Sequence, residues 1–235
     1  MDVGIRNLQV LRLGGVEIWI TETMVNTWWI MAILILLSLI VRFKIRDFEE
    51  IPDGYQNVIE ALVEYFDYFI CSSIGSKFYY LGNWFFMVFA FIMMSNLISL
   101  FGLRAPTADW SMTFACAFAS FIIVQLVGLK QRGAAYLKTF FEPNFLFFPL
   151  NVIGELSRPV SLSFRLFGNV LSGTIIIAIV YNVAPVILQL LLPAVLHVYF
   201  DIIIGIIQTY IFCVLSFSFI RSASGVDAAQ QEAAD

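Results

Sequence analysis

Long apolar runs, separated by short polar segments, dominate the hydropathy pattern of this chain. A helix needs roughly 20 mostly apolar residues to cross a hydrocarbon core about 30 Å thick, and several of the runs reach that length. The runs cover residues 24–41, 84–101, 112–127, 145–182 and 185–220. The pattern predicts an all-α polytopic membrane protein, with about five membrane-crossing helices that form a single integral membrane domain over residues 1–235.

The last two runs are longer than one perpendicular crossing requires. Each contains 36 to 38 residues, which is about 55 Å as a helix, and the usual tilt of about 20° absorbs only a modest excess. Two arrangements fit this length. Either Pro159 and Pro193 divide each run into two short helices, or the pair forms a long, strongly tilted hairpin.

A more polar stretch, residues 47–80, separates the first two runs. Within it, apolar residues recur at helical spacing, while the acidic residues Glu60, Glu64 and Asp67 fall elsewhere. The recurring apolar residues are Val58, Ala61, Leu62, Tyr65, Phe66 and Phe69. This pattern predicts an amphipathic helix that lies on the membrane surface or against a partner.

Basic residues cluster after the first run, at 42–46, and after the third run, at 130–138. Basic segments beside membrane helices favour the cytoplasmic side, and five alternating crossings put both clusters there. This predicts an N-terminus outside the membrane and a cytoplasmic C-terminus. The first twenty residues lack the basic n-region and short apolar core of a cleavable signal peptide.

Composition excludes most soluble functions. The chain is 60% hydrophobic and 13% charged, with a mean hydropathy of +0.88, whereas an ordinary soluble domain is nearer half apolar and a quarter charged. The sequence has no glycine-rich phosphate loop and no nucleophile elbow, so we expect no cofactor and no nucleic-acid partner. Cys71, Cys116 and Cys213 are isolated and the chain has one histidine, so no metal site is expected.

One permanent charge, Arg165, lies inside the otherwise apolar stretch 161–180. A charge at the centre of a membrane helix costs about 2.5–3.5 kcal/mol even on a lenient insertion scale. The residues that share its helical face are small or polar and none is acidic: Ser161, Gly168, Asn169 and Ser172. Either Arg165 pairs with a carboxylate elsewhere in the fold, or it faces a functional interior.

A second polar strip lies in the last run. His197, Asp201, Gly205 and Gln208 follow one another at spacings of four, four and three, which puts them on one helical face. Asp201 is the one acidic residue between positions 156 and 226, so it is the natural internal partner for Arg165. Alternatively, His197 and Asp201 pass protons, or they form a hydrogen-bonded pair that holds two helices together.

Glu155 is a third candidate. It lies ten residues before Arg165, about 15 Å along a helix and turned away from the face of the arginine. It either lines an aqueous entry from the cytoplasmic side or extends its carboxylate to that interface.

Four segments of the chain resemble a known family, the a subunit of the membrane sector of rotary (F-type) ATP synthases. PVSLSFRLFGN at 159–169 is similar to the arginine motif of that family, and IIQTYIFCVL at 206–215 to its glutamine motif. NLISLFGLRAPTADWSMT at 96–113 is similar to the turn between its second and third spans. FEPNFLFFPLNVIGELSRP at 141–159 is similar to the approach to its long hairpin, and the likeness runs from about residue 20 to 220.

The resemblance implies the tilted hairpin and an ion-conducting stator subunit, with no enzymatic activity of its own, in a bacterial plasma membrane. It implies that the hairpin packs against a ring of c subunits. Two half-channels then carry H⁺ (or Na⁺) to and from the ring, which couples ion flow to rotation and ATP synthesis. Other implied partners are b-type peripheral stalk subunits, membrane lipid and, indirectly, the soluble ATPase sector.

The resemblance also implies roles for single residues. The essential arginine of the family falls on Arg165, and its neighbouring asparagine and glutamine fall on Asn169 and Gln208. The acid or histidine seven residues before that glutamine falls on Asp201, where relatives more often have Glu or His. Candidate residues for the lining of the half-channels are Glu155, Ser161, Ser172 and His197, of which His197 matches no position of the family.

A function of another class is a proton-coupled secondary transporter that uses Arg165 for an anionic substrate. Transporters often consist of repeated halves, and residues 20–130 show no repeat of residues 140–220. A purely structural membrane subunit would leave both polar strips unexplained. The ion-conducting subunit is therefore the preferred interpretation.

Overall fold

The computed structural model describes residues 7–13, 16–48, 54–141 and 144–225. Within these residues, five helical segments are long and apolar enough to cross a membrane, which confirms the prediction. They are Glu22–Lys44, Ser76–Phe101, Trp110–Arg132, Phe145–Val183 and Leu191–Ser224. The predicted sides of the two chain ends concern residues 1–6 and 226–235, which lie outside the described residues.

Two helices begin two residues before the predicted apolar runs, and a polar side chain caps each N-terminal end. Helix α1 spans Glu22–Lys44, and the side chain of Thr21 accepts a hydrogen bond from the Met24 amide. Helix α4 spans Trp110–Arg132, and Asp109 accepts from the Ser111 amide. Such caps satisfy amide groups that the first turn of a helix leaves without partners. The apolar runs therefore mark only the part of each helix that suits hydrocarbon.

A small β-hairpin precedes α1 and was not predicted. Strands β1 (Asn7–Leu13) and β2 (Val16–Thr21) are antiparallel, with Val10 opposite Trp19 and Leu13 opposite Val16. The sequence signal is Gly14 and Gly15 between the strands, a residue pair typical of hairpin turns. The all-α prediction holds for the membrane-crossing part of the chain.

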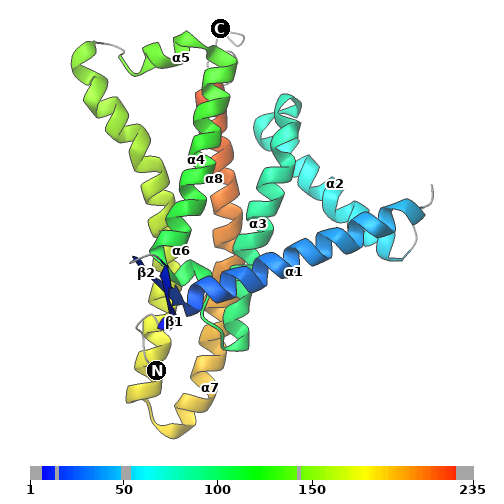
Figure 1. Cartoon of the computed structure of the whole chain (residues 1–235), viewed down its shortest axis with the longest axis vertical. Helices are drawn as coiled ribbons and strands as arrows, with labels where there is room; N and C mark the ends of the chain where they lie inside the picture. The colour runs from blue at the N-terminus through cyan, green and yellow to red at the C-terminus, as the bar shows by residue number, and fades with distance from the viewer. Residues whose placement is uncertain (1–6, 14–15, 49–53, 142–143, 226–235) are drawn as a thin grey trace.

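The predicted amphipathic helix corresponds to α2, which spans Tyr55–Ile74. Only its C-terminal half packs on the bundle, where Phe66, Ile70 and Ile74 are buried. Val58 and Tyr65, which the periodicity assigned to the apolar face, are about 70% exposed, as a face turned toward the membrane surface or a partner would be. Figure 1 shows α1 and α2 extending away from the other helices, so the N-terminal half of α2 has no bundle to pack against.

The other elements follow along the chain. Helix α3 (Gly82–Leu97) lies between the 3₁₀ segments η2 (Ser76–Leu81) and η3 (Ile98–Phe101). The short segments are η1 (Ile45–Asp47), η4 (Pro106–Ala108), α5 (Ala134–Thr139) and η5 (Phe145–Phe147). The C-terminal helices are α6 (Phe148–Val183), α7 (Val186–His197) and α8 (Gly205–Ser224), and the π-helical segment η6 (Val198–Ile204) joins α7 to α8.

The last two runs form a long hairpin, and their division into short helices is wrong. Helix α6 is continuous over 36 residues with Pro159 inside it. The returning arm, from α7 through η6 to α8, continues past Pro193. A proline removes one backbone hydrogen bond, and membrane helices tolerate it where neighbouring helices pack around it. Pro159 is such a case, because it is buried and α6 packs along α4.

Helix α8 lies at the centre of the bundle. It contacts α2, α3 and α4, and Figure 1 shows it between α3 and α4. Phe212, Cys213, Phe217 and Ile220 of this helix are fully buried. Cys213 is thus a small apolar core residue, as predicted.

Candidate functional site

Arg165 projects from the middle of α6 and is exposed. Among the described residues, its side chain has no hydrogen bond and no ion pair. Ser161 and Ser172, one turn before it and two turns after it, are exposed on the same helix. The arginine is therefore not held by a carboxylate of the described chain, and Asp201 is not its partner.

Asn169 and Gln208 join the two arms of the hairpin. The amide nitrogen of Asn169 on α6 donates a hydrogen bond of 2.7 Å to the amide oxygen of Gln208 on α8. Gln208 is 4% exposed, and its own amide nitrogen is buried without a partner among the described residues. A buried donor of this kind needs an acceptor or a water, so the site retains hydrogen-bonding capacity for a partner.

A small polar cavity lies beside this bond. It is lined in part by Asn96, Asn169, Asp201, Gly205 and Gln208, and its volume is about 10 Å³. That volume holds about one water molecule. The structure thus brings together three polar side chains that the sequence predicted, Asn169, Asp201 and Gln208, and two that it did not, Asn96 and Ser99.

Asn96 reaches the site because Gly205 permits it. Its amide nitrogen donates to the Gly205 carbonyl at 3.3 Å, and its amide oxygen accepts from Thr107 at 3.3 Å. A Cβ atom at position 205 would lie 3.0 Å from the Cβ of Asn96. The sequence signal for Asn96 was a polar residue near the end of the apolar run 84–101, with Ser99 three residues later on the same helical face.

His197 and Asp201 form a pair at the start of η6. Nδ1 of His197 lies 2.6 Å from Oδ2 of Asp201, and the two side chains are 31% and 15% exposed. Asp201, Gly205 and Gln208 of the predicted strip line the small cavity. His197 does not line it but contacts Asp201 directly.

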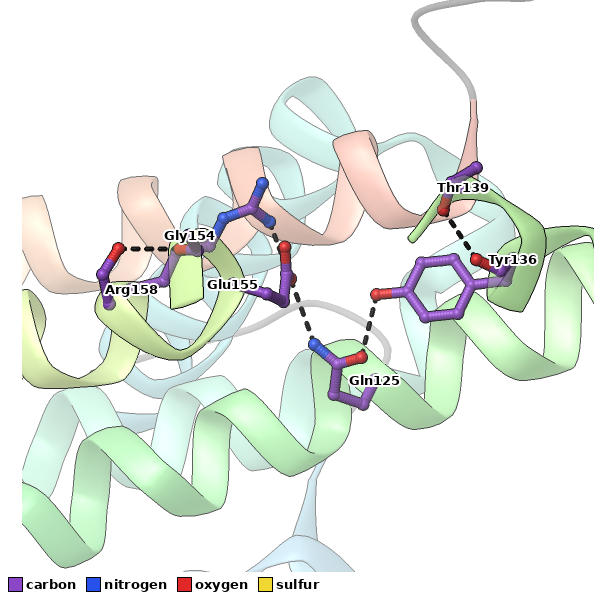
Figure 2. Close-up of polar contacts among 7 residues, drawn as sticks. Gln125, Tyr136, Thr139, Gly154, Glu155 and Arg158 are labelled. Atoms are coloured by element: carbon purple, nitrogen blue, oxygen red, sulfur yellow. Dashed lines mark hydrogen bonds and ion pairs between the residues drawn. The ribbon is translucent and has the colours of Figure 1, made fainter. Parts of the chain in front are cut away.

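Glu155 belongs to a different site, near the start of α6. Its Oε1 atom accepts 2.9 Å from Nη1 of Arg158 and 3.0 Å from the amide nitrogen of Gln125 on α4. The amide oxygen of Gln125 accepts from the Tyr136 hydroxyl at 2.9 Å. Figure 2 shows Gln125 of α4 and Arg158 of α6 at the Glu155 carboxylate, and Tyr136 of α5 at the other end of the Gln125 amide. Neither Gln125 nor Tyr136 was predicted, because both partners come from distant parts of the sequence.

A pocket of about 420 Å³ opens beside Glu155. Arg132, Tyr136, Glu155 and Arg158 are among the residues that line it. Burial, and then the nearby charge of Glu155, raises the pKa of the Tyr136 phenol, so the phenol is a neutral hydrogen-bond donor at physiological pH. Among the described residues, no group of three or more His, Cys, Asp or Glu side chains is placed to hold a metal ion.

Comparisons with known proteins show the family to which the chain belongs. Residues 24–221 match the family described as ATP synthase A chain. The chain is similar to ATP synthase subunit a of Moorella thermoacetica, with 35% identity over 93% of this chain and 96% of the relative. It is also similar to ATP synthase subunit a 2 of Acaryochloris marina, with 36% identity over 88% of this chain and 87% of the relative.

A third relative is the sodium ion specific ATP synthase subunit a of Propionigenium modestum, with 30% identity over 88% of this chain and 75% of the relative. The family match covers most of the chain, including both arms of the hairpin, Arg165 and the Asn169–Gln208 bond. These relatives and the five membrane-crossing helices identify a multi-pass membrane subunit that serves ion transport and ATP synthesis. The chain therefore belongs to the ATP synthase A chain family and is a subunit of the membrane sector of an F-type ATP synthase.

Proposed function

We propose that this chain is the ion-conducting stator subunit of its synthase and that Arg165 faces a rotating ring of c subunits. The observation that carries the proposal is an exposed, permanently charged side chain, in the middle of an apolar helix, with no partner among the described residues. Such a charge is expensive in lipid. It is accounted for when the compensating carboxylate belongs to another, moving subunit.

Arg165 then acts through its charge. A ring carboxylate that arrives from the lipid is neutral while it carries its ion, and an opposite charge within a few Å favours its charged form. The ion leaves into one half-channel, and another ion enters from the second. Because a guanidinium does not give up its proton, Arg165 also separates the two half-channels electrostatically.

The two half-channels approach Arg165 from opposite ends of α6. The outer one includes His197, Asp201 and the cavity beside Gln208 and Asn169, which is supported by the polar lining of that cavity. The inner one begins at the pocket beside Glu155. Ser161 and Ser172 are exposed on the two sides of Arg165, where each half-channel meets the ring.

The surrounding assembly follows from the same proposal. The chain lies in a bacterial plasma membrane with its N-terminus outside and its C-terminus in the cytoplasm. It contacts b-type stalk subunits as well as the c ring. It performs no nucleotide chemistry, which belongs to the soluble sector. The transported ion is H⁺ or Na⁺; one relative is named as sodium ion specific, so transport is to be assayed with both ions.

Substitution of Arg165 tests the proposal. Arg165→Ala should reduce coupled ATP synthesis to background and let ions leak passively between the half-channels. Arg165→Lys should also abolish synthesis, because lysine lacks the planar fork, has a shorter reach and can release its proton when desolvated. The measurement is ATP synthesis and passive ion flux in vesicles that carry equal amounts of assembled complex.

A matched control is Arg46→Ala, which removes one exposed arginine after α1 and should leave both quantities unchanged. Near-normal synthesis by the Arg165→Ala complex would reject the mechanism. A variant that neither synthesises ATP nor leaks would reject the barrier role alone.

A further inference from the structure

Both hydrogen bonds to Glu155 end on the same oxygen. The donors from Arg158 and Gln125 both reach Oε1. Among the described residues, Oε2 accepts no hydrogen bond, and Glu155 lines the pocket of about 420 Å³. A volume in the range of roughly 300–1,000 Å³ is typical of sites that admit ligands or several waters. The carboxylate is thus fixed at one oxygen and open at the other.

Tyr136 determines which way the Gln125 amide points. Because the Gln125 oxygen accepts from the Tyr136 hydroxyl, its nitrogen must face Glu155. The opposite orientation would put two acceptor oxygens against each other and leave the phenol without its acceptor. An amide is nearly symmetrical in shape, so the Tyr136 hydroxyl is what selects the donating orientation.

Tyr136 is itself held in place by α4 and by its own helix. Its ring packs on Gly128, where a Cβ atom would lie 2.8 Å from the ring carbons. Its carbonyl accepts from the Thr139 hydroxyl at 2.6 Å, and its ring meets that of Phe140 edge-on at 5.5 Å. The ring is also buried. The phenol therefore has little freedom to move away from Gln125.

The charged and titratable groups that face this pocket come from three helices. Arg132 comes from α4, Tyr136 from α5, and Glu155 and Arg158 from α6, while α8 contributes Ser222 and Ala223. Two guanidinium groups raise the electrostatic cost of a metal cation in the pocket. A proton reaches the carboxylate by transfer from water and neutralises it, so the free oxygen of Glu155 suits a proton.

We propose that Gln125 and Tyr136 are positioning residues that hold Glu155 with Oε2 open to the pocket, as the atom at which protons enter from the basic end of the bundle. A proton leaves hydronium, forms an O–H bond at Oε2 and releases water; it then passes along α6 toward the ring carboxylate that faces Arg165. This inference rests on the proposed function, including its orientation of the chain.

The test is ATP-driven proton pumping by the assembled complex in vesicles, measured against the proton concentration on the face from which protons are taken up. A hydrogen-bond donor on a carboxylate favours its charged form. Removing one should therefore make Glu155 hold its proton more tightly. For Tyr136→Phe and Gln125→Leu we expect the half-maximal proton concentration on that face to fall about 3- to 10-fold, the effect of one hydrogen bond.

Three controls separate positioning from general damage. Tyr80→Phe removes a phenol hydroxyl near Lys130, at the same end of the bundle. This variant should leave the dependence of pumping on proton concentration unchanged. During ATP synthesis, protons enter from the opposite face of the membrane. The dependence of the synthesis rate on the proton concentration at that face should be unchanged in all variants. Tyr136→Phe in a Glu155→Gln background should cause no further shift, since the group it acts through is gone.

Unshifted profiles for both positioning variants would overturn the inference. The inference would also be overturned if the variants lowered the rates of ATP-driven pumping and of ATP synthesis equally without shifting the half-maximal proton concentration. That result would indicate structural damage. Sodium-dependent pumping, insensitive to pH, would overturn the choice of proton. These outcomes are distinct from failure of the proposed function, which would appear as normal synthesis by the Arg165→Ala complex.

Discussion

The carboxylate of Asp201 has two kinds of surroundings, the His197 side chain and a small polar cavity. One oxygen lies 2.6 Å from His197, and the residue also lines the small cavity with Asn169 and Gln208. The i, i+4 spacing made the His197 pair predictable from the sequence. The Asn169–Gln208 bond and the Gln125–Glu155 bond were not predictable as contacts, because hydropathy and spacing give no information about pairs 39 and 30 residues apart.

A charge-removing change at Asp201 should slow ion flow. Asp201→Asn keeps the size and one hydrogen bond to His197 but cannot carry a proton, so we expect pumping to fall at least 10-fold with assembly intact. Asp201→Glu should keep most of the rate. The readout is ion flux and ATP synthesis at equal amounts of complex. Asp67→Asn, on exposed α2, removes a carboxylate that only accepts from Tyr79 and should have no effect. Normal conduction by Asp201→Asn would leave Asp201 with a packing role.

At the level of elements, the returning arm of the hairpin departs from ideal helix geometry where it meets the cavity. The π-helical segment η6 carries Asp201 and brings Phe200 against Gly173 of α6, where a Cβ atom would lie 3.1 Å from the Phe200 side chain. Hydrophobic periodicity predicted one long helical run there but not the π turn. The reason is that a π turn is stabilised by contacts between helices, while periodicity reads a single helix.

Filling Gly173 should therefore loosen the hairpin. Gly173→Ala pushes a methyl group into Phe200, and overpacking of this kind costs about 1–3 kcal/mol. Gly154→Ala is the matched control on the same helix, since nothing lies within 4 Å of the added Cβ. We expect the thermal midpoint of the detergent-solubilised complex to fall by about 2–4 °C per kcal/mol for the first variant and not for the second. Equal midpoints would show that Phe200 moves aside at no cost.

At the level of the whole molecule, hydropathy predicted the number of crossings and the surface helix, yet it did not predict which helix is central. The interior of a membrane bundle is as apolar as the lipid around it, so composition does not separate the segment of α8, which is 39% buried, from α1, which is 17% buried. Polar residues within apolar runs were the better guide. Arg165, Asp201 and Gln208 were found in this way, and the last two line one cavity.

The orientation of the bundle can be tested by labelling. In a background without reactive native cysteines, a cysteine at Asp2 should react with an impermeant thiol reagent from outside the cell. A cysteine at Asp227 should react only in inverted membranes, because the basic segments at 42–46 and 130–138 favour the cytoplasm. Labelling of both positions from one side would contradict five crossings with opposite ends.

The exposed guanidinium of Arg165 also bears on how the chain is made. Under the proposed function a ring subunit covers Arg165 in the assembled complex; before docking, an unpaired charge in a membrane helix carries about 2.5–3.5 kcal/mol. We therefore expect the inserted chain to be less stable before docking than after it, and more accessible to proteases that act on transiently opened states. On this proposal, the same charge favours removal of copies that stay unassembled.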